Sequence, residues 1–326
     1  MRTRSCTSGC LGSGRTVPRP NLFILGAMKS GTTSLHRYLS AHPQVFMSEP
    51  KEPNFFVEEL NWRKGLDWYL ELFASAGKAV VVGESSTEYS KLPTYTGVAR
   101  RIHAFDPAAR LIYLMRDPLD RIRSHYWHNV ADLKHEAERR NMLSAVREDP
   151  RYVAYSDYAV QLEPYLELFG RERIALLTTE QLAADPTAVV TTLCSWLGLT
   201  GVPPSEAFSE QWNVRPAEGR SVRGRGLLNR LRHSAFWETI RPWWPRPLRD
   251  IGLRLAERRT PPRDRSELEA IDYLRPMLRV RCEALTRLVG RDFPEWKALQ
   301  GTIGDAGRGE GMARSAGPLP RRVSGE

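Results

Sequence analysis

The sequence of 326 residues predicts an α/β fold, in which a parallel sheet carries helices on both faces and a basic helical annex follows at the C-terminal end. Three observations predict it. Short apolar runs alternate with amphipathic segments between residues 20 and 205, a glycine-rich turn follows the first run, and strand signals vanish after about residue 205. With 41% apolar and 26% charged residues, the composition excludes a wholly disordered protein.

Four apolar runs are the predicted strands. Each holds three to five residues without polar alternation, which is typical of strands buried on both faces of a parallel sheet. In chain order they are residues 21–25, 80–82, 111–115 and 174–177.

Amphipathic segments after these runs predict the helices. The clearest start is Asp117-Pro118, because aspartate is a favoured N-cap and proline a favoured first helical residue. The first helix is stopped by His42-Pro43. The predicted helices are residues 34–41, 95–105, 117–130, 156–169, 187–197 and, in the annex, 266–288.

The two ends of the chain lack periodicity. Residues 1–19 and 301–326 are rich in Gly, Ser, Arg and Pro, so we predict disordered tails, the first of them basic. Between the tails we predict one domain over residues 20–300. Its α/β core covers residues 20–205 and its helical annex covers residues 206–300.

The formal charge of +10 is concentrated in the annex. Residues 214–265 hold fourteen arginines, no lysine and five acidic residues, a local excess of nine. These arginines alternate with prolines and tryptophans, which favours a packed cover over a nucleic-acid-binding arm. We therefore expect attraction to anions and no nucleic-acid partner.

No stretch approaches ~18 uncharged apolar residues, so no membrane span is predicted. The first residues lack an apolar signal core. The four cysteines are widely separated or lack companion ligands, which suits a reducing compartment and argues against a metal site. The expected location is the cytoplasm.

The segment after the first predicted strand has the pattern of an anion-binding loop. Gly26 and Gly31 allow the backbone to curl, so that consecutive N–H groups point at one anion beside the positive end of a helix. The spacing is that of a nucleotide P-loop, but Thr32 stands where that motif has its lysine, and the lysine is at position 29. Nothing in this P-loop-like segment requires a metal. The alternative is a plain glycine-rich turn with a surface lysine.

A second anion site is predicted where the third strand ends. Arg116 would leave the carboxyl edge of the sheet, which is where open α/β folds bind ligands. Arg121 and Ser124 are three residues apart on the following helix and are expected to share a face. Guanidinium and hydroxyl groups that converge there suit a second phosphate.

Together these two segments resemble the co-substrate signatures of sulfotransferases that use 3′-phosphoadenosine 5′-phosphosulfate (PAPS). Residues 51–56 and 65–69 are similar to the Glu-x-x-Phe-Phe and Gly-x-x-Trp-Tyr elements of the heparan-sulfate type and its bacterial relatives. The resemblance covers roughly residues 20–215 and, more weakly, continues to about residue 298. It points to a soluble, bacterial-type member, because the paired cysteines and membrane anchor of the animal Golgi enzymes are absent.

The resemblance implies PAPS as co-substrate, with no metal required. Lys29 would contact the bridging oxygen and stabilise the departing 3′-phosphoadenosine 5′-phosphate (PAP). Arg220 belongs to one of two late arginine loops that could also reach the co-substrate, the other being residues 223–225. The implied co-substrate ligands are Lys29, Ser30, Gly31, Thr32, Thr33, Ser34, Arg116, Ser124 and Arg220.

A hydroxyl or amine acceptor loses a proton as it attacks, so a general base is needed. Glu52 matches the catalytic glutamate of the family, and Glu49 is the competitor in the same loop. Asn54 stands where many relatives have histidine, and Ser85 where heparan-type enzymes often have lysine. The implied acceptor contacts are Trp68, Glu84 and Tyr89.

Other uses of these residues remain open. Trp62, Trp68 and Trp212 could stack on sugar rings, although core packing is the more frequent use of tryptophan. The histidines at 36, 42, 125 and 128 are expected to be structural or surface groups.

The predicted function is sulfuryl transfer from PAPS to a carbohydrate-like or glycosylated acceptor, which could be anionic. The pattern does not separate O- from N-sulfation, a glycan from a small molecule, or a monomer from an oligomer. A P-loop nucleotide kinase or NTPase is disfavoured, since the lysine before Thr33 is missing. A catalytically silent anion-binding module is disfavoured by the presence of both Lys29 and Glu52.

Overall fold

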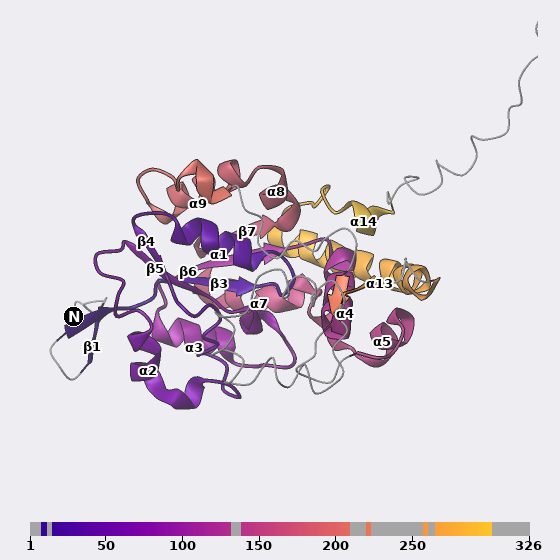
Figure 1. The fold of residues 1–326 in the computed structure, drawn as a ribbon, viewed down its shortest axis with the longest axis horizontal. Coiled ribbons are helices and arrows are strands. Elements are labelled where there is room, and N and C mark those ends of the chain that lie inside the picture. The colour runs from indigo at the N-terminus through magenta and orange to yellow at the C-terminus, as the bar shows by residue number, and fades with distance from the viewer. Residues whose placement is uncertain are drawn as a thin grey trace, which may run out of the picture.

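A computed structural model of the chain describes residues 8–11, 15–131, 138–208, 220–222, 257–259 and 265–301. Its centre is a five-stranded sheet in which every neighbouring pair of strands is parallel (Figure 1). The strands in spatial order are β4 (Val45–Met47), β5 (Val81–Ser85), β3 (Leu22–Gly26), β6 (Arg110–Met115) and β7 (Ile174–Thr178). The four predicted strands and their parallel arrangement are confirmed.

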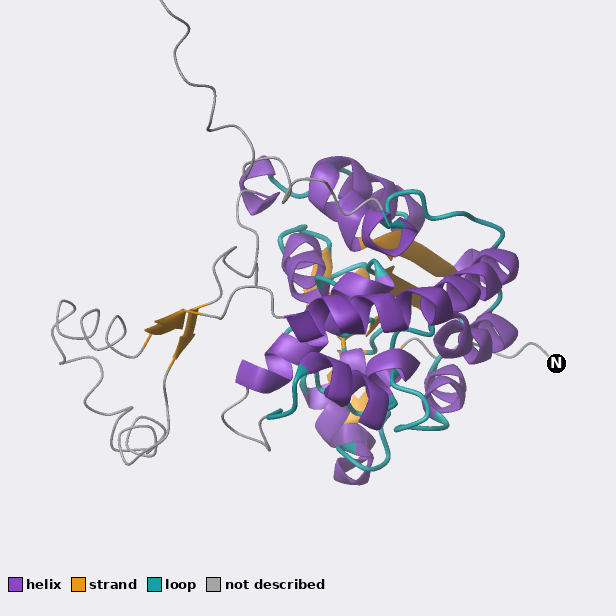
Figure 2. Cartoon of the chain, turned by 90° about the vertical axis from the view of Figure 1, so that its right-hand side faces the viewer, coloured by secondary structure: helices purple, strands orange, loops and turns teal. Residues whose placement is uncertain are grey.

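Helices cover both faces of this sheet, as predicted (Figures 1 and 2). In Figure 1, α1, α8 and α9 lie on one side, while α2, α3 and α7 lie on the other. The helices in chain order are α1 (Thr32–Ser40), α2 (Gly65–Glu71), α3 (Val98–Phe105), α4 (Pro118–Ala131), α5 (Met142–Glu148), α6 (Arg151–Ala154), α7 (Tyr158–Phe169), α8 (Thr179–Ala184), α9 (Pro186–Leu197), α13 (Arg265–Val289) and α14 (Lys297–Gln300). Four short 3₁₀ segments complete the described helical elements, η1 (Trp62–Lys64), η2 (Thr87–Ser90), η3 (Arg171–Arg173) and η4 (Ser205–Phe208).

The central strands are apolar throughout because both of their faces are buried. Along β3, Phe23 and Leu25 pack into one hydrophobic core, whereas Leu22 and Ile24 pack into the other. All four side chains have no exposed surface. Successive side chains of a strand point to opposite faces, so a strand between two helical layers is apolar at every position.

Three short features differ from the prediction. Strand β4, whose three residues are all apolar, was not among the predicted strands. In the tail that was expected to be disordered, β1 (Ser8–Leu11) and β2 (Arg15–Pro18) pair antiparallel. In the annex, where no strand was expected, β8 (Arg220–Val222) pairs antiparallel with β9 (Glu257–Arg259). Strands of three or four residues form by backbone hydrogen bonding without a detectable apolar period.

Most of the arginine-rich segment 214–265 lies outside the described residues, and so does the tail beyond residue 301. The role expected for that segment is therefore still a prediction. Within the described chain, no helix is long and apolar enough to cross a membrane.

The long annex helix, α13, is confirmed and is fixed to the elements that follow β6. Arg123 of α4 forms an ion pair with Glu267 at 2.7 Å, and Arg281 forms one with Asp157 beside α7. The Leu299 N–H in α14 donates to Asp117 Oδ2 at 2.9 Å. The annex thus stabilises the start of α4, which is the predicted second anion site.

Replacing Asp117 with alanine is expected to lower the free energy of unfolding by about 2–3 kcal/mol. Asp117 is 2% exposed, caps α4 by accepting from Leu119 N at 3.0 Å, and holds the Leu299 N–H. Urea unfolding measures the loss. The matched control is Asp120→Ala, which removes a partly exposed ion pair with Arg123 on the same helix and should cost less than about 1 kcal/mol. Equal losses in the two variants would contradict the capping role.

Candidate active site

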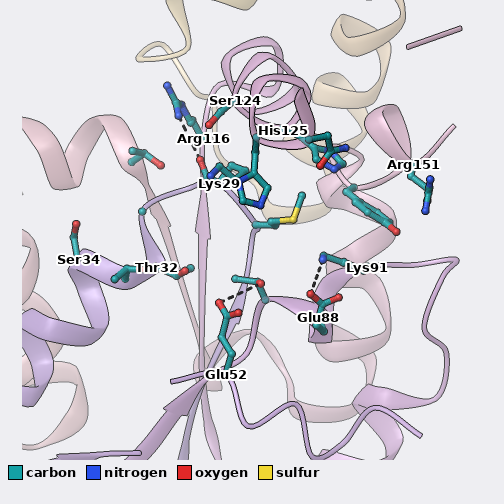
Figure 3. Close-up of a pocket in the computed structure, with 18 of the residues that line it drawn as sticks. Lys29, Thr32, Ser34, Glu52, Glu88, Lys91, Arg116, Ser124, His125 and Arg151 are labelled. Atoms are coloured by element: carbon teal, nitrogen blue, oxygen red, sulfur yellow. Dashed lines mark hydrogen bonds and ion pairs between the residues drawn. The ribbon is translucent and has the colours of Figure 1, made fainter. Parts of the chain in front are cut away.

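A cleft of about 1630 Å³ lies beyond the carboxyl ends of the central strands (Figure 3). The loops after β3, β4, β5 and β6 line it, together with α4 and the start of α8. Parallel strands end at a common edge, which is the usual ligand-binding edge of an open α/β sheet.

The loop between β3 and α1 curls as its glycines predicted. Gly31, at φ 87°, is the N-cap of α1, and a Cβ on Gly26 would lie 2.2 Å from Ser90 Oγ. The first turn of α1 has no side-chain cap and no acidic residue. The positive end of α1 is therefore available to an anion in the cleft. The predicted ligands that line the cleft here are Lys29, Gly31, Thr32, Thr33 and Ser34.

Ser30 departs from its expected role as a co-substrate ligand. Its side chain has no exposed surface, and its N–H donates to the Ala27 carbonyl at 3.1 Å. Its carbonyl accepts a hydrogen bond from Thr179 Oγ1 at 2.7 Å. Ser30 therefore stabilises the loop through its backbone hydrogen bonds and does not line the cleft.

Three described non-glycine residues have positive φ, namely Lys29 (70°), Glu52 (66°) and Asn54 (50°). Such a conformation costs about 1–3 kcal/mol per residue and persists only where the surroundings impose it. Two of the three are the predicted catalytic residues, and the third is two positions from Glu52. Strain concentrated in these two loops supports their assignment to the active site.

The second anion site lies beside the first. Arg116 and Ser124 both line the cleft, and Arg116 Nη1 donates to the Lys29 carbonyl at 3.4 Å (Figure 3). The Arg116 carbonyl accepts from Tyr158 Oη at 2.8 Å. The two predicted anion loops are therefore in direct contact, because β3 and β6 are neighbours in the sheet.

Arg121 does not line the cleft with Ser124, contrary to expectation. Its side chain has no exposed surface, and it donates to the Tyr152 carbonyl at 2.6 Å and to the Ser156 hydroxyl. The buried Tyr152 carbonyl and Ser156 hydroxyl both need a hydrogen-bond donor, and the Arg121 guanidinium supplies it. Arg121 holds α4 against α6 and the segment that joins α6 to α7.

Glu52 enters the cleft from the side opposite Lys29 (Figure 3). Its Oε1 lies 2.5 Å from Lys51 Nζ and 3.4 Å from Thr87 Oγ1, and its side chain is 37% exposed. The competitor Glu49 is exposed but is not part of the cleft lining. This geometry favours Glu52 as the base.

The three expected acceptor contacts do not line the cleft. Glu84 is 0% and Tyr89 is 3% exposed, so an acceptor cannot reach either side chain. Trp68 packs 6.3 Å from the Phe55 ring, with Lys64 Nζ 4.3 Å above it. Arg220 lies in β8, but its side chain and the loop 223–225 are outside what the structure describes, as is Trp212.

One arm of the cleft was not predicted. It combines charged and polar groups from segments that are far apart in the chain, such as Thr94 and Tyr155, which are 61 residues apart. Lys91 pairs with Glu88 at 2.6 Å, and Thr94 Oγ1 lies 2.5 Å from Tyr155 Oη. No local spacing signals such a juxtaposition, because the tertiary fold creates it. The residues of this arm, called here the distal arm, are Glu88, Lys91, Thr94, Tyr95, Asn129, Glu138, Arg139, Arg140, Asp149, Arg151 and Tyr155.

Two buried histidines are His36, which lies outside the cleft lining, and His125, which is part of it. His36 Nδ1 lies 2.9 Å from Ser85 Oγ, and burial, assisted by the positive charge of Lys51, lowers its pKa to about 4. Burial, with Arg121 nearby, also holds the pKa of His125 well below its ordinary value. Both imidazoles are therefore neutral near pH 7.

The free energy of unfolding is expected to fall as the pH drops from 6.5 toward 4. The unfolded chain binds a proton at His36 with a pKa near 6.5, whereas the folded chain resists it until about pH 4. Acid therefore favours unfolding, and His36 accounts for about 1.6 kcal/mol between pH 6.5 and 5. Urea unfolding of His36→Gln should show a shallower pH dependence than the parent. An unchanged slope would show that His36 has the same pKa in the folded and the unfolded protein.

A family model, the sulfotransferase domain, matches residues 19–214, which are 196 of the 326 residues. The chain belongs to the sulfotransferase domain family. The match ends where the resemblance seen in the motifs was expected to weaken, and it confirms that resemblance.

Similar proteins include both branches that the motifs suggested. The bifunctional heparan sulfate N-deacetylase/N-sulfotransferase 4 of Mus musculus is 26% identical over 217 residues, 61% of this chain and 24% of that protein. The corresponding enzyme 2 of Homo sapiens is 29% identical over 201 residues, 56% of this chain and 22% of that protein. The chain thus spans about a quarter of the length of these relatives.

A solved structure extends the similarity to most of the fold. The sulfotransferase from Alicyclobacillus acidocaldarius aligns with a TM-score of 0.61 and 27% identity, covering 86% of this chain and all of that one. The coverage exceeds the segment matched by the family model. The predicted fold class is confirmed.

Proposed function

We propose that this sulfotransferase moves the sulfuryl group of PAPS to a hydroxyl or amine of a carbohydrate-like or glycosylated acceptor. One observation carries the proposal. Two anion loops in mutual contact and a carboxylate on the opposite side line the same cleft.

The chemistry of the two loops fits the donor nucleotide. The uncapped end of α1, with Lys29, suits the 5′-phosphosulfate. Arg116 and Ser124 supply a charged fork and a hydroxyl for the 3′-phosphate. That phosphate distinguishes PAPS from ATP or GTP.

The reaction needs a base on the acceptor side and positive charge on the leaving side. The acceptor oxygen or nitrogen attacks sulfur, the bond from sulfur to the bridging phosphate oxygen breaks, and the acceptor proton passes to the Glu52 carboxylate. Lys29 stabilises the negative charge that gathers on the leaving PAP. Lys51 and Thr87 hydrogen-bond to Glu52 Oε1 and orient the carboxylate.

The distal arm suits a polar acceptor. Its hydroxyl, amide and guanidinium groups match the hydrogen-bonding groups of a sugar, and Tyr95 and Tyr155 add aromatic rings. Lys91, Arg139 and Arg151 would also allow an anionic substituent on it. The names of the relatives include heparan sulfate, which supports a glycan acceptor.

Transfer of radiolabelled sulfate from PAPS to a panel of acceptors tests the proposal. The panel should contain de-N-sulfated heparan chains, which offer amines, and neutral oligosaccharides, which offer only hydroxyls. Labelled product is expected with at least one of them. Phosphate transfer from ATP instead would favour a kinase. Nucleotide binding without any transfer would favour a silent binding module.

Arg116→Ala should weaken the binding of PAP by about 10- to 100-fold and leave ADP binding unchanged. ADP lacks the 3′-phosphate that Arg116 is proposed to hold. Calorimetric titration of both nucleotides measures the difference, and Arg100→Ala, an exposed arginine on α3, is the control. Equal weakening of both nucleotides would instead assign Arg116 to shaping the Lys29 loop through their shared hydrogen bond.

A further inference from the structure

Glu84 is a buried carboxylate directly beneath the loop that carries Glu52. It lies in β5, has no exposed surface, and accepts three hydrogen bonds from hydroxyl groups. These come from Tyr69 Oη at 2.7 Å, Tyr89 Oη at 2.7 Å and Ser86 Oγ at 2.6 Å. Among the described ion pairs, none involves Glu84. Burying a carboxylate that has hydroxyl partners and no cation costs free energy, which suggests that Glu84 has a function at this position.

Two of the three hydroxyl groups also accept hydrogen bonds from the loop that carries Glu52. Ser86 Oγ accepts from the Asn54 N–H at 3.0 Å, and Tyr89 Oη accepts from the Phe56 N–H at 3.4 Å. Each hydroxyl has one proton, and here it is donated to Glu84, which leaves the oxygen lone pairs for the backbone N–H groups. Because a carboxylate only accepts, it fixes the direction of both hydrogen-bond chains.

The loop is held at every second residue. The Glu52 N–H donates to the Ser85 carbonyl at 3.0 Å, and the Asn54 and Phe56 N–H groups donate to the two hydroxyls. Glu52 and Asn54 are also two of the described residues with positive φ. Such a backbone needs support from outside the loop, and the segment after β5 supplies it.

We propose that Glu84 is a positioning residue for Glu52. Its carboxylate orients Ser86 and Tyr89, which hold the strained loop in the conformation that turns Glu52 into the cleft. The proposal rests on the proposed function, which makes Glu52 the base. It gives Glu84 and Tyr89 a role at the site although neither residue lines the cleft.

Two tyrosines provide a matched test. Tyr69→Phe and Tyr89→Phe each remove one hydroxyl donor to Glu84 and keep the ring, but Tyr89 alone of the two accepts from the loop. In Tyr89→Phe, hydrogen exchange of the Phe56 amide should accelerate at least about tenfold, and kcat should fall by about 10- to 100-fold with an unchanged KM for PAPS. In Tyr69→Phe, exchange in residues 52–57 and kcat should stay within about twofold of the parent.

Glu84→Gln tests the carboxylate itself. The glutamine oxygen can still accept from both tyrosines, but its NH₂ group would face Ser86 Oγ, which then loses the acceptor for its proton. Exchange of the Asn54 amide should therefore accelerate more than that of Phe56. Thermal stabilisation by PAP verifies that each variant is folded.

Equal exchange and equal kcat in the two tyrosine variants would overturn the positioning role. If Glu52 were not the catalytic base, the results would differ from these. Glu52→Gln would then retain its turnover, while the exchange contrast between the tyrosine variants would persist. Because exchange is measured without an acceptor, the contrast is decisive even before the acceptor is known.

Discussion

Glu52→Gln is expected to lower kcat by about 10²- to 10⁴-fold and to leave PAP affinity unchanged. The amide cannot take the proton of the acceptor, yet its size and the contacts of the loop are nearly preserved. Glu52 lies across the cleft from the anion loops, and its carboxylate accepts hydrogen bonds from Lys51 and Thr87. Steady-state transfer assays and calorimetric titration with PAP measure the two quantities.

Glu49→Gln is the matched control, since this glutamate is in the same loop but outside the cleft lining. It should keep nearly the parental kcat. If Glu49→Gln lost turnover and Glu52→Gln did not, the two glutamates would have to exchange roles.

Lys29→Met is expected to lower kcat by about 10²- to 10³-fold. Methionine keeps most of the side-chain length but removes the charge that would stabilise the leaving phosphate. The backbone of Lys29, at φ 70°, and its carbonyl hydrogen bond to Arg116 should persist. Single-turnover measurements separate this chemical defect from weaker PAPS binding.

Lys64→Met is a suitable control, because Lys64 lies over the Trp68 ring and outside the cleft lining. Its kcat should be unchanged. A Lys29→Met variant that lost only PAPS affinity, with full kcat at saturation, would show that Lys29 binds ground state and transition state equally.

Most of the core could be predicted because its signals are local. Strand β3 is apolar at each position since Phe23 and Ile24 point into different cores. The helix at α4 begins at the Asp-Pro pair that marks it in the sequence. Strand β4 was not predicted; its three residues form an edge strand by pairing with β5 alone.

Only those parts of the site that are formed by residues adjacent in the chain could be predicted. The curl from Gly26 to Ser34 depends on residues next to each other in the chain, and so does the position of Arg116 at the end of β6. Arg121 and Glu84 were predicted to contact ligands but are buried, and the reason is the same for both. A polar residue in a motif looks the same in sequence whether it faces a ligand or is satisfied by buried hydroxyl and carbonyl groups. The distal arm depends on contacts between distant segments, which no spacing encodes.

Thermal unfolding with PAP, compared with ADP and with ATP in the presence and absence of magnesium, tests the central claim most directly. A ligand at about 100 times its dissociation constant should add ~2.7 kcal/mol to the free energy of unfolding. We expect a metal-independent stabilisation by PAP that greatly exceeds that by ADP. Stabilisation only by ATP with magnesium would contradict a PAPS-binding cleft.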